Sequence, residues 1–79
     1  MDRRALHQAL RAAGVADGHY WIEGVHEPAP TPVDHLFLRA GAGTGARWEV
    51  GAYERGVHEV IAAYDDEAAA CTHLLRLLT

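Results

Sequence analysis

The length of the chain is the feature that most constrains what it can fold into. With 79 residues, it has room for one small hydrophobic core, and we expect a single domain over residues 1–79. That length excludes doubly wound nucleotide folds, TIM barrels and most complete enzyme scaffolds. Hydrophobic residues make up 49% of the chain, which is too large a share for a disordered tail.

The charge balance narrows the choice of partner. The formal net charge is -4 at pH 7, and an acidic domain is a poor candidate for binding nucleic acid, whose phosphates favour clustered Lys and Arg. Most of the excess lies between Glu49 and Glu67, where six acids accompany one Arg. This acidic half could meet a basic partner. The alternative is a solvated surface that keeps a small protein from aggregating.

The sequence shows no targeting signal and no set of cysteines that could form a disulfide or a zinc site. The start of the chain is amphipathic and does not resemble a signal peptide. No stretch approaches the ~20 apolar residues of a membrane span, so we expect a cytoplasmic protein with no membrane contact. Cys71 is the one cysteine, which excludes an internal disulfide and a Cys-based zinc site.

Helix signals stand at both ends of the sequence. Asp2 can cap a first helix whose apolar stripe of Ala and Leu ends at Gly14. The acids of residues 65–67 favour the start of a second helix, because its first N–H groups are unpaired. That helix carries an apolar stripe on which Cys71 falls, so we expect a buried, inert thiol.

The middle of the chain predicts four strands, over residues 19–26, 33–40, 47–53 and 57–64. Prolines at 28, 30 and 32 form a rigid connector between the first two strands. Residues 41–45 form a flexible Gly-rich loop, and Glu54-Arg55-Gly56 forms a three-residue hairpin loop.

The order of these elements predicts an α+β fold: a helix, a four-stranded antiparallel meander and a C-terminal helix. Short connections favour the antiparallel arrangement, because consecutive strands usually lie side by side. Both helices are expected on one face of the sheet, where their apolar stripes can be buried.

Each catalytic signature fails on a named residue. Gly41-x-Gly43-x-x-Ala46 resembles a dinucleotide fingerprint, but a strand follows it where a helix is needed. The sequence from His58 resembles a zinc-protease motif, but Ala62 stands where the second His is required. The chain contains no Ser. We therefore expect no enzyme activity, no catalytic residue, no cofactor and no metal site.

Carboxylates and histidines leave weaker alternatives open. Glu23 with Glu27, or Glu49 with Glu59, could form an acid–base pair, although a solvated strand face is the plainer interpretation. Six histidines are present and no two of them lie three or four residues apart: His7, His19, His26, His35, His58 and His73. His19 and His35 could meet across strands, so a small-ligand or metal-binding domain remains a second alternative.

The two tryptophans are expected in the core. A small sheet needs large apolar side chains on its helix-facing side, which suits Trp21 and Trp48. A Trp that faced outward would be an interface anchor, because Trp and Arg dominate binding hot spots.

The C-terminal half resembles small bacterial immunity proteins, the neutralising partners of polymorphic and contact-dependent toxins. The resemblance covers roughly residues 46–78 and consists of an aromatic strand, an acid-Arg-Gly hairpin, a second strand, an acidic turn and a leucine-bearing helix. The residues that carry it are Trp48, Glu54-Arg55-Gly56, Asp65-Asp66-Glu67, Ala70-Cys71 and Leu74-Leu75. The segment YWIEGVHEPAPTP also resembles short actinobacterial proteins of uncertain role.

The resemblance implies a non-enzymatic inhibitor that binds a cognate toxin, either a nuclease or an enzyme acting on a nucleotide cofactor. An acidic surface could steer it onto a basic cleft. The candidate partner-binding residues are Glu49, Glu54, Arg55 and Glu59, with Glu23 and His26 as a second patch. The first alternative is a structural or oligomerising module that pairs through an exposed sheet edge.

Overall fold

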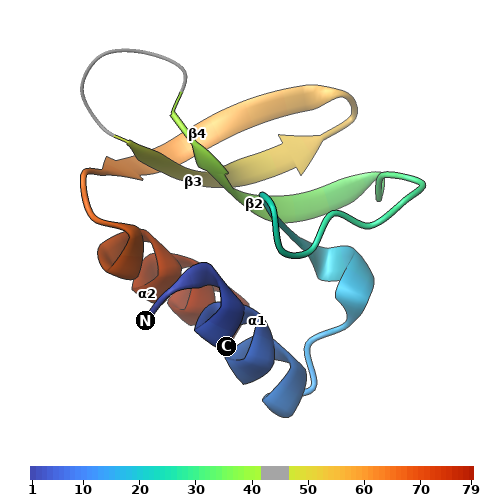
Figure 1. Ribbon diagram of the computed structural model, residues 1–79. Coiled ribbons are helices and arrows are strands. Elements are labelled where there is room, and N and C mark those ends of the chain that lie inside the picture. Colours follow the sequence, from blue (N-terminus) through green and yellow to red (C-terminus); the bar gives the residue numbers. More distant parts are fainter. Residues whose placement is uncertain (42–46) are drawn as a thin grey trace.

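The computed structural model describes residues 1–41 and 47–79, and shows two helices beside a four-stranded sheet (Figure 1). The elements in chain order are α1 (Arg3–Ala12), a short 3-10 turn η1 (Asp17–His19), β1 (Tyr20–Ile22), β2 (Asp34–Ala40), β3 (Trp48–Glu54), β4 (Val57–Tyr64) and α2 (Glu67–Leu78). The α+β class predicted from the sequence is confirmed. The expected loop 41–45 and the Gly43 and Ala46 positions of the fingerprint lie outside the described residues, except for Gly41.

Both long helices begin where the sequence places an acidic cap. The Asp2 carboxylate accepts a hydrogen bond from the Ala5 N–H at 2.8 Å, and the Asp66 carboxylate accepts one from the Ala68 N–H at 3.1 Å. Each satisfies a backbone donor that has no partner within its own helix. Asp66 therefore has a structural role within the acidic segment.

The sheet is mixed, with strand order β1-β2-β3-β4. β2 with β3 and β3 with β4 are antiparallel, but β1 pairs in parallel with β2. The prediction of a purely antiparallel meander is therefore wrong at β1. Its premise of short connections fails here, because residues 23–33 form a connection long enough to return the chain to the same end of the sheet.

The strand predicted over residues 19–26 is also shorter than expected. Gly24 has φ +75°, a left-handed conformation that glycine adopts without steric cost. The chain therefore reverses after β1, and Ile22 and His26 exchange two backbone hydrogen bonds of 2.8 Å. Tyr20, Trp21 and Ile22 therefore form β1, whereas Val25 belongs to the turn and not to one long strand.

The β3–β4 hairpin has a two-residue turn, Arg55-Gly56, where three residues were predicted. Glu54 pairs with Val57, and φ is 51° at Arg55 and 84° at Gly56. Positive φ at both central positions is the requirement of a type I′ turn, whose twist matches that of the strands. Further along, the register shifts between Val50 and Gly51, so that Ile61 is an extra residue in β4.

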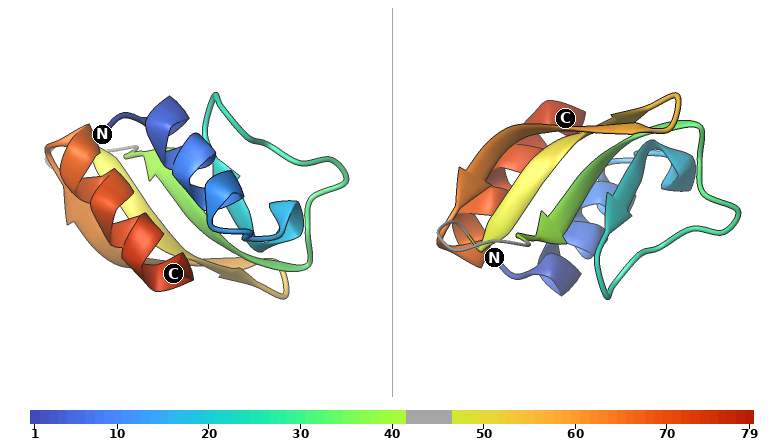
Figure 2. Two further views of the ribbon diagram at one scale, coloured as in Figure 1. Left: turned by 90° about the horizontal axis from the view of Figure 1, so that it is seen from below. Right: turned by 90° about the horizontal axis from the view of Figure 1, so that it is seen from above.

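The hydrophobic core lies between the sheet and the helices, which lie on the same side of the sheet in both views of Figure 2. We call this side of the sheet the covered face. The buried residues of this core come from both long helices and from β1, β2 and β3: Leu6, Leu10, Tyr20, Ile22, Leu38, Val50, Ala70, Cys71 and Leu74. The predicted burial of Cys71 is confirmed, and burial raises the pKa of its thiol to about 11.

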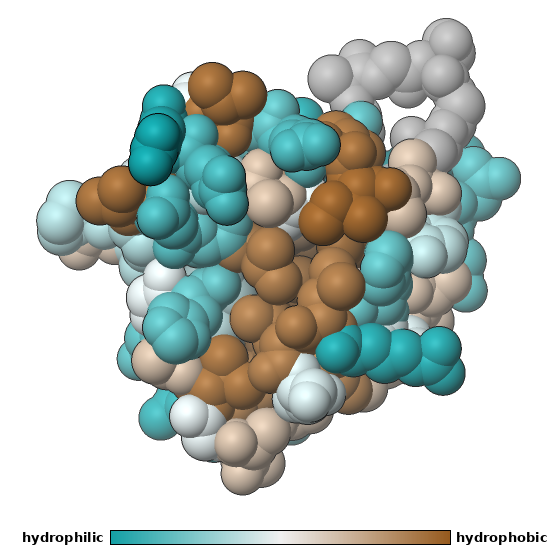
Figure 3. Space-filling view, turned by 180° about the vertical axis from the view of Figure 1, so that it is seen from behind, coloured by the Kyte–Doolittle hydropathy of each residue, from teal (hydrophilic) through white to brown (hydrophobic). Residues whose placement is uncertain are grey.

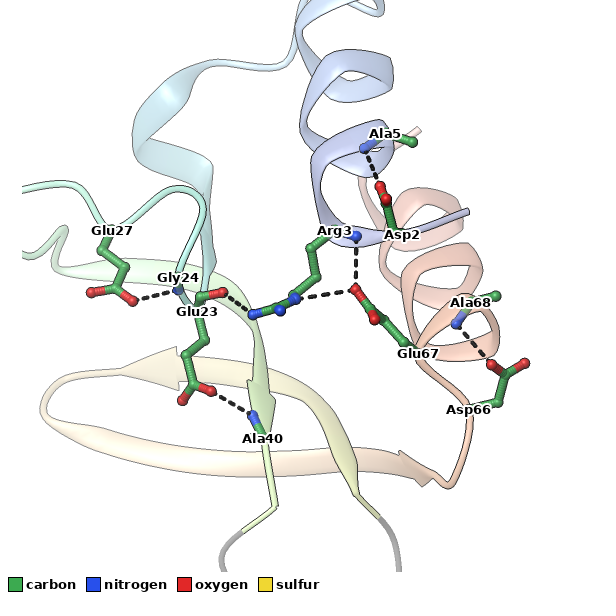
Figure 4. Close-up of polar contacts among 10 residues, drawn as sticks. All are labelled: Asp2, Arg3, Ala5, Glu23, Gly24, Glu27, Ala40, Asp66, Glu67 and Ala68. Atoms are coloured by element: carbon green, nitrogen blue, oxygen red, sulfur yellow. Dashed lines mark hydrogen bonds and ion pairs between the residues drawn. The ribbon is translucent and has the colours of Figure 1, made fainter.

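One arginine joins three parts of this arrangement (Figure 4). The Arg3 backbone N–H and Nε both donate to the Glu67 carboxylate, at 3.0 and 3.1 Å, which links the start of α1 to the start of α2. Its Nη1 donates to the Glu23 carbonyl at 2.7 Å. The guanidinium also lies 4.9 Å from the ring centre of Trp48. Glu67 is therefore a structural residue as well.

Candidate functional site

The second face of the sheet carries no helix of the described part of the chain, and the right-hand view of Figure 2 looks directly onto it. We call it the open face. Because side chains alternate along a strand, the residues between the core positions point to this side. They are Trp21 on β1, His35, Phe37 and Arg39 on β2, Glu49, Gly51 and Tyr53 on β3, and His58, Val60 and Ala63 on β4.

A row of four residues crosses the middle of the open face. Trp21 pairs with Phe37, Phe37 with Gly51, and Gly51 with Val60. A Cβ on Gly51 would lie 2.5 Å from Cζ of Phe37, so the ring lies directly over the glycine backbone. Phe37 is thereby 1% exposed although no helix covers it. The aromatic ring gives the open face a small core of its own.

A second row, nearer the hairpin turn, is aromatic and imidazole in character. His35 and Tyr53 stack with ring centres 4.9 Å apart, and Tyr53 lies 4.6 Å from His58. His58 in turn presents an edge to Phe37 at 5.3 Å. His35 is buried, and its Nδ1 donates to the Pro32 carbonyl at 3.2 Å. These contacts hold the rings in fixed positions.

An ion pair forms the third row, at the other end of the face. Arg39 Nε donates to the Glu49 carboxylate at 2.8 Å, and both side chains are partly exposed. The Arg39 guanidinium also lies 4.8 Å from the ring centre of Phe37. The arginine is thus held in place by a carboxylate and a π face together.

These rows enclose a hollow of about 290 Å³. It is lined by residues of the open face and by one residue of the connector: Trp21, Thr31, His35, Phe37, Arg39, Tyr53 and His58. Its aromatic walls and its Arg and His groups suit contact with another protein. Within residues 1–41 and 47–79, no three His, Cys, Asp or Glu side chains are placed to hold a metal ion.

The structure separates the four residues of the first predicted patch. Glu49 lies on the open face and is paired with Arg39. Glu59 is opposite Ala52 and Glu54 is opposite Val57, positions on the other side of the hairpin. Arg55 lies in the turn between them and is exposed. Glu49 and Glu59 consequently do not form a carboxylate pair.

The second predicted patch is engaged in local contacts. The Glu23 carboxylate accepts a hydrogen bond from the Ala40 N–H at 3.3 Å (Figure 4). The Glu27 carboxylate accepts one from the Gly24 N–H at 2.6 Å. His26 Nε2 donates to the Asp17 carbonyl at 2.8 Å. Glu23 and Glu27 therefore stabilise the turn after β1.

The two tryptophans lie on opposite faces. Trp48 is packed against the core, as predicted. The same prediction is wrong for Trp21, because its neighbours Tyr20 and Ile22 are the buried residues of β1 and alternation points Trp21 to the open face. Trp21, Arg39 and Tyr53 are thus site residues that the sequence argument missed. The signal for Trp21 was the alternation of side chains along the strand: if Tyr20 and Ile22 face the core, Trp21 between them faces the other way.

A histidine pair lies on the covered side. His7 of α1 is 4.7 Å from His26 between ring centres, and Tyr20 is 4.6 Å from His26. Burial, His26 and Arg11 lower the pKa of His7, while Asp17 opposes them. The Tyr20 hydroxyl is buried without a hydrogen-bond partner among the described residues.

No family model, curated protein or solved structure matches this chain. Neither α1 nor α2 combines the length and apolar character that crossing a membrane requires. The open face, with its aromatic and charged side chains, is therefore the candidate site.

Proposed function

We propose that this chain is a non-enzymatic immunity protein that binds a cognate bacterial toxin domain through the open face of its sheet. The observation that carries the proposal is the uncovered face itself, where Trp21, Arg39 and Tyr53 surround a hollow of about 290 Å³. These three residue types contribute most to binding energy at protein interfaces.

The face is also held in shape before any partner arrives. Phe37 is buried beneath its neighbours, and Arg39 is fixed by Glu49. A rigid surface loses little conformational entropy on binding, which supports a tight complex. An inhibitor that acts by occupying a cleft needs this rigidity and needs no chemistry of its own.

The charge favours a toxin with a basic cleft. The chain has a net charge of -4, and opposite charge on a partner raises the rate of association. Nucleases, and enzymes that act on nucleotide cofactors, bind phosphates and therefore have such clefts. Glu54 and Glu59 are exposed on the other side of the β3–β4 hairpin, where their charge would act on an approaching partner over a distance and not by contact.

Co-expression with the protein encoded by the adjacent gene tests this proposal. We expect protection of the host cell and co-purification of a 1:1 complex. Trp21→Ala should weaken the complex by about 30-fold or more, the loss typical of a hot-spot residue. Gln8→Ala, an exposed change on α1, is the matched control and should bind normally.

Two results would overturn the proposal. The first is the absence of both protection and co-purification with the unaltered chain. The second is a Trp21→Ala variant that binds as tightly as Gln8→Ala, which would exclude the open face as the interface.

A further inference from the structure

We propose that β4 pairs with β4 of a second copy, antiparallel, to join two four-stranded sheets into one sheet of eight strands. β4 stands at one end of the sheet order, so its outer backbone N–H and C=O groups have no strand beside them among the described residues. An extended strand is the ligand that satisfies such a row of groups. β4 has eight residues, whereas β1 at the opposite edge has three.

Apart from the bulge at Ile61 and one acid that points to the covered side, β4 lacks the features that protect natural edge strands from pairing. It contains no Lys, Arg or Pro, and Glu59 is its one acid. Val57, Val60 and Ile61 are 65%, 42% and 49% exposed. An edge of this length and apolarity is expected to be covered by another chain.

The bulge in β4 selects the register of the pairing. Val57 and Glu59 point to the covered side and His58 to the open face, but the extra residue Ile61 shifts the alternation so that Ala62 and Tyr64 point to the covered side. A two-fold axis between Val60 and Ile61 therefore places side chains of the same face opposite one another. The resulting pairs are Val57 with Tyr64, His58 with Ala63, and Glu59 with Ala62.

The charges at the two ends of β4 are complementary in that register. The turn residue Arg55 of one copy comes alongside Asp65 and Asp66 of the other, and the symmetry repeats this contact at the opposite end. Arg55 and Asp65 are both exposed, and neither forms an ion pair or side-chain hydrogen bond within the described part of the chain. Two such contacts would favour the antiparallel orientation over a slipped register.

The same axis covers an apolar surface beside the strand. Figure 3 shows a band of apolar side chains on the side of the molecule where β4 and α2 lie. Leu77 of α2 is 43% exposed. Because an axis perpendicular to the sheet leaves the helices of both copies on one side, it brings the two α2 helices towards each other and buries this band.

Sedimentation equilibrium of the 79-residue chain tests the pairing. We expect twice the mass of one chain. Val60→Lys, which places a charge on the free edge, should weaken self-association at least about tenfold, while circular dichroism should remain unchanged. A monomer at every accessible concentration overturns the proposal, and so does a dimer that Val60→Lys leaves equally tight.

Charge exchange tests the register. Arg55→Asp and Asp65→Arg should each weaken self-association at least about tenfold, because each places like charges together at both ends. An equimolar mixture of the two variants should restore a dimer, since both contacts between positions 55 and 65 of unlike copies are then pairs of opposite charges. Arg4→Asp, an exposed change on α1 with the same change of net charge as Arg55→Asp, is the control and should dimerise normally. A mixture that remains monomeric overturns this register.

This inference is independent of the proposed toxin binding. The two-fold axis leaves Trp21, Arg39 and Tyr53 exposed on the open face of both copies. The chain could therefore fail either test and pass the other.

Discussion

The two faces of the same sheet each bury an apolar side chain of β2, but by different means. Leu38 is 0% exposed on the covered face and Phe37 is 1% exposed on the open face. Leu38 lies beneath two helices, whereas Phe37 contacts Arg39 and His58 and lies beside Trp21 of the neighbouring strand. The covered face holds the domain together, and the open face presents an aromatic surface that is already ordered.

The largest effect is expected on the covered face. Leu38→Ala removes a fully buried side chain from the core and should lower the free energy of unfolding by about 2–5 kcal/mol, because the cavity cannot be filled. Urea denaturation followed by tryptophan fluorescence measures this loss. A cost no greater than that of Trp21→Ala would contradict the assignment of the main core to the covered face.

Gly51→Ala should have the next largest effect. The new Cβ would meet the Glu59 carbonyl and would lie 2.5 Å from Cζ of Phe37. The overpacking should cost about 1–3 kcal/mol of unfolding free energy, again measured in urea. Gly18→Ala is the matched control, because an added Cβ there meets nothing within 4 Å and φ is not positive. Equal stability of the two variants would show that Phe37 does not lie against the strand.

Trp21→Ala should destabilise the fold by only about 1 kcal/mol or less, because Trp21 lies outside the main core. The same substitution is expected to abolish most binding to a toxin partner. Comparing the denaturation midpoint with the dissociation constant separates the two effects. A loss of stability as large as that of Leu38→Ala would mean that the open face is needed for folding.

The smallest expected effect is a pH dependence on the covered side. The pKa of His7 is lowered from 6.5 by burial, His26 and Arg11, with Asp17 opposing and the Tyr20 ring packed beside it. Near and below pH 6.5 the folded state therefore binds fewer protons than the unfolded state. The contribution of His7 to the free energy of unfolding is consequently present above pH 6.5 and is lost as the pH falls below it.

His7→Gln should reduce the difference in the free energy of unfolding between about pH 8 and about pH 5, measured by urea denaturation. His19→Gln, a change at an exposed histidine, is the control and should leave the slope intact. An unchanged slope in His7→Gln would remove His7 as the cause.

The sequence predicted well the elements that are defined by local signals. Asp2 caps α1 as predicted, and α2 begins within the predicted acidic segment 65–67, with Asp66 as its cap, because capping depends on residues within one turn. β4 runs over residues 57–64 as predicted, and β2 and β3 differ by one residue at their ends. The Arg-Gly pair that closes the β3–β4 hairpin is equally local, although its turn has two residues where three were expected.

The remaining features depend on partners distant in the sequence. The parallel pairing of β1 requires knowledge of where residues 23–33 return the chain, and no local pattern gives that. Glu49 belongs to the acidic segment by sequence, but Arg39, ten positions away, neutralises it across the sheet. Glu67 is likewise bound by Arg3, 64 positions away. The acidic segment is therefore a weaker guide to the binding surface than its charge suggested.

The Arg3–Glu67 contact also has a consequence for synthesis on the ribosome. The first helix packs on the last one, so the leucines of α1 have no complete core to enter until residues 67–78 have been made. Domains generally fold as units as they emerge, and this unit is completed only by α2. The domain is therefore expected to fold only after residues 67–78 have emerged from the ribosome, with the apolar stripe of α1 accessible to chaperones until then.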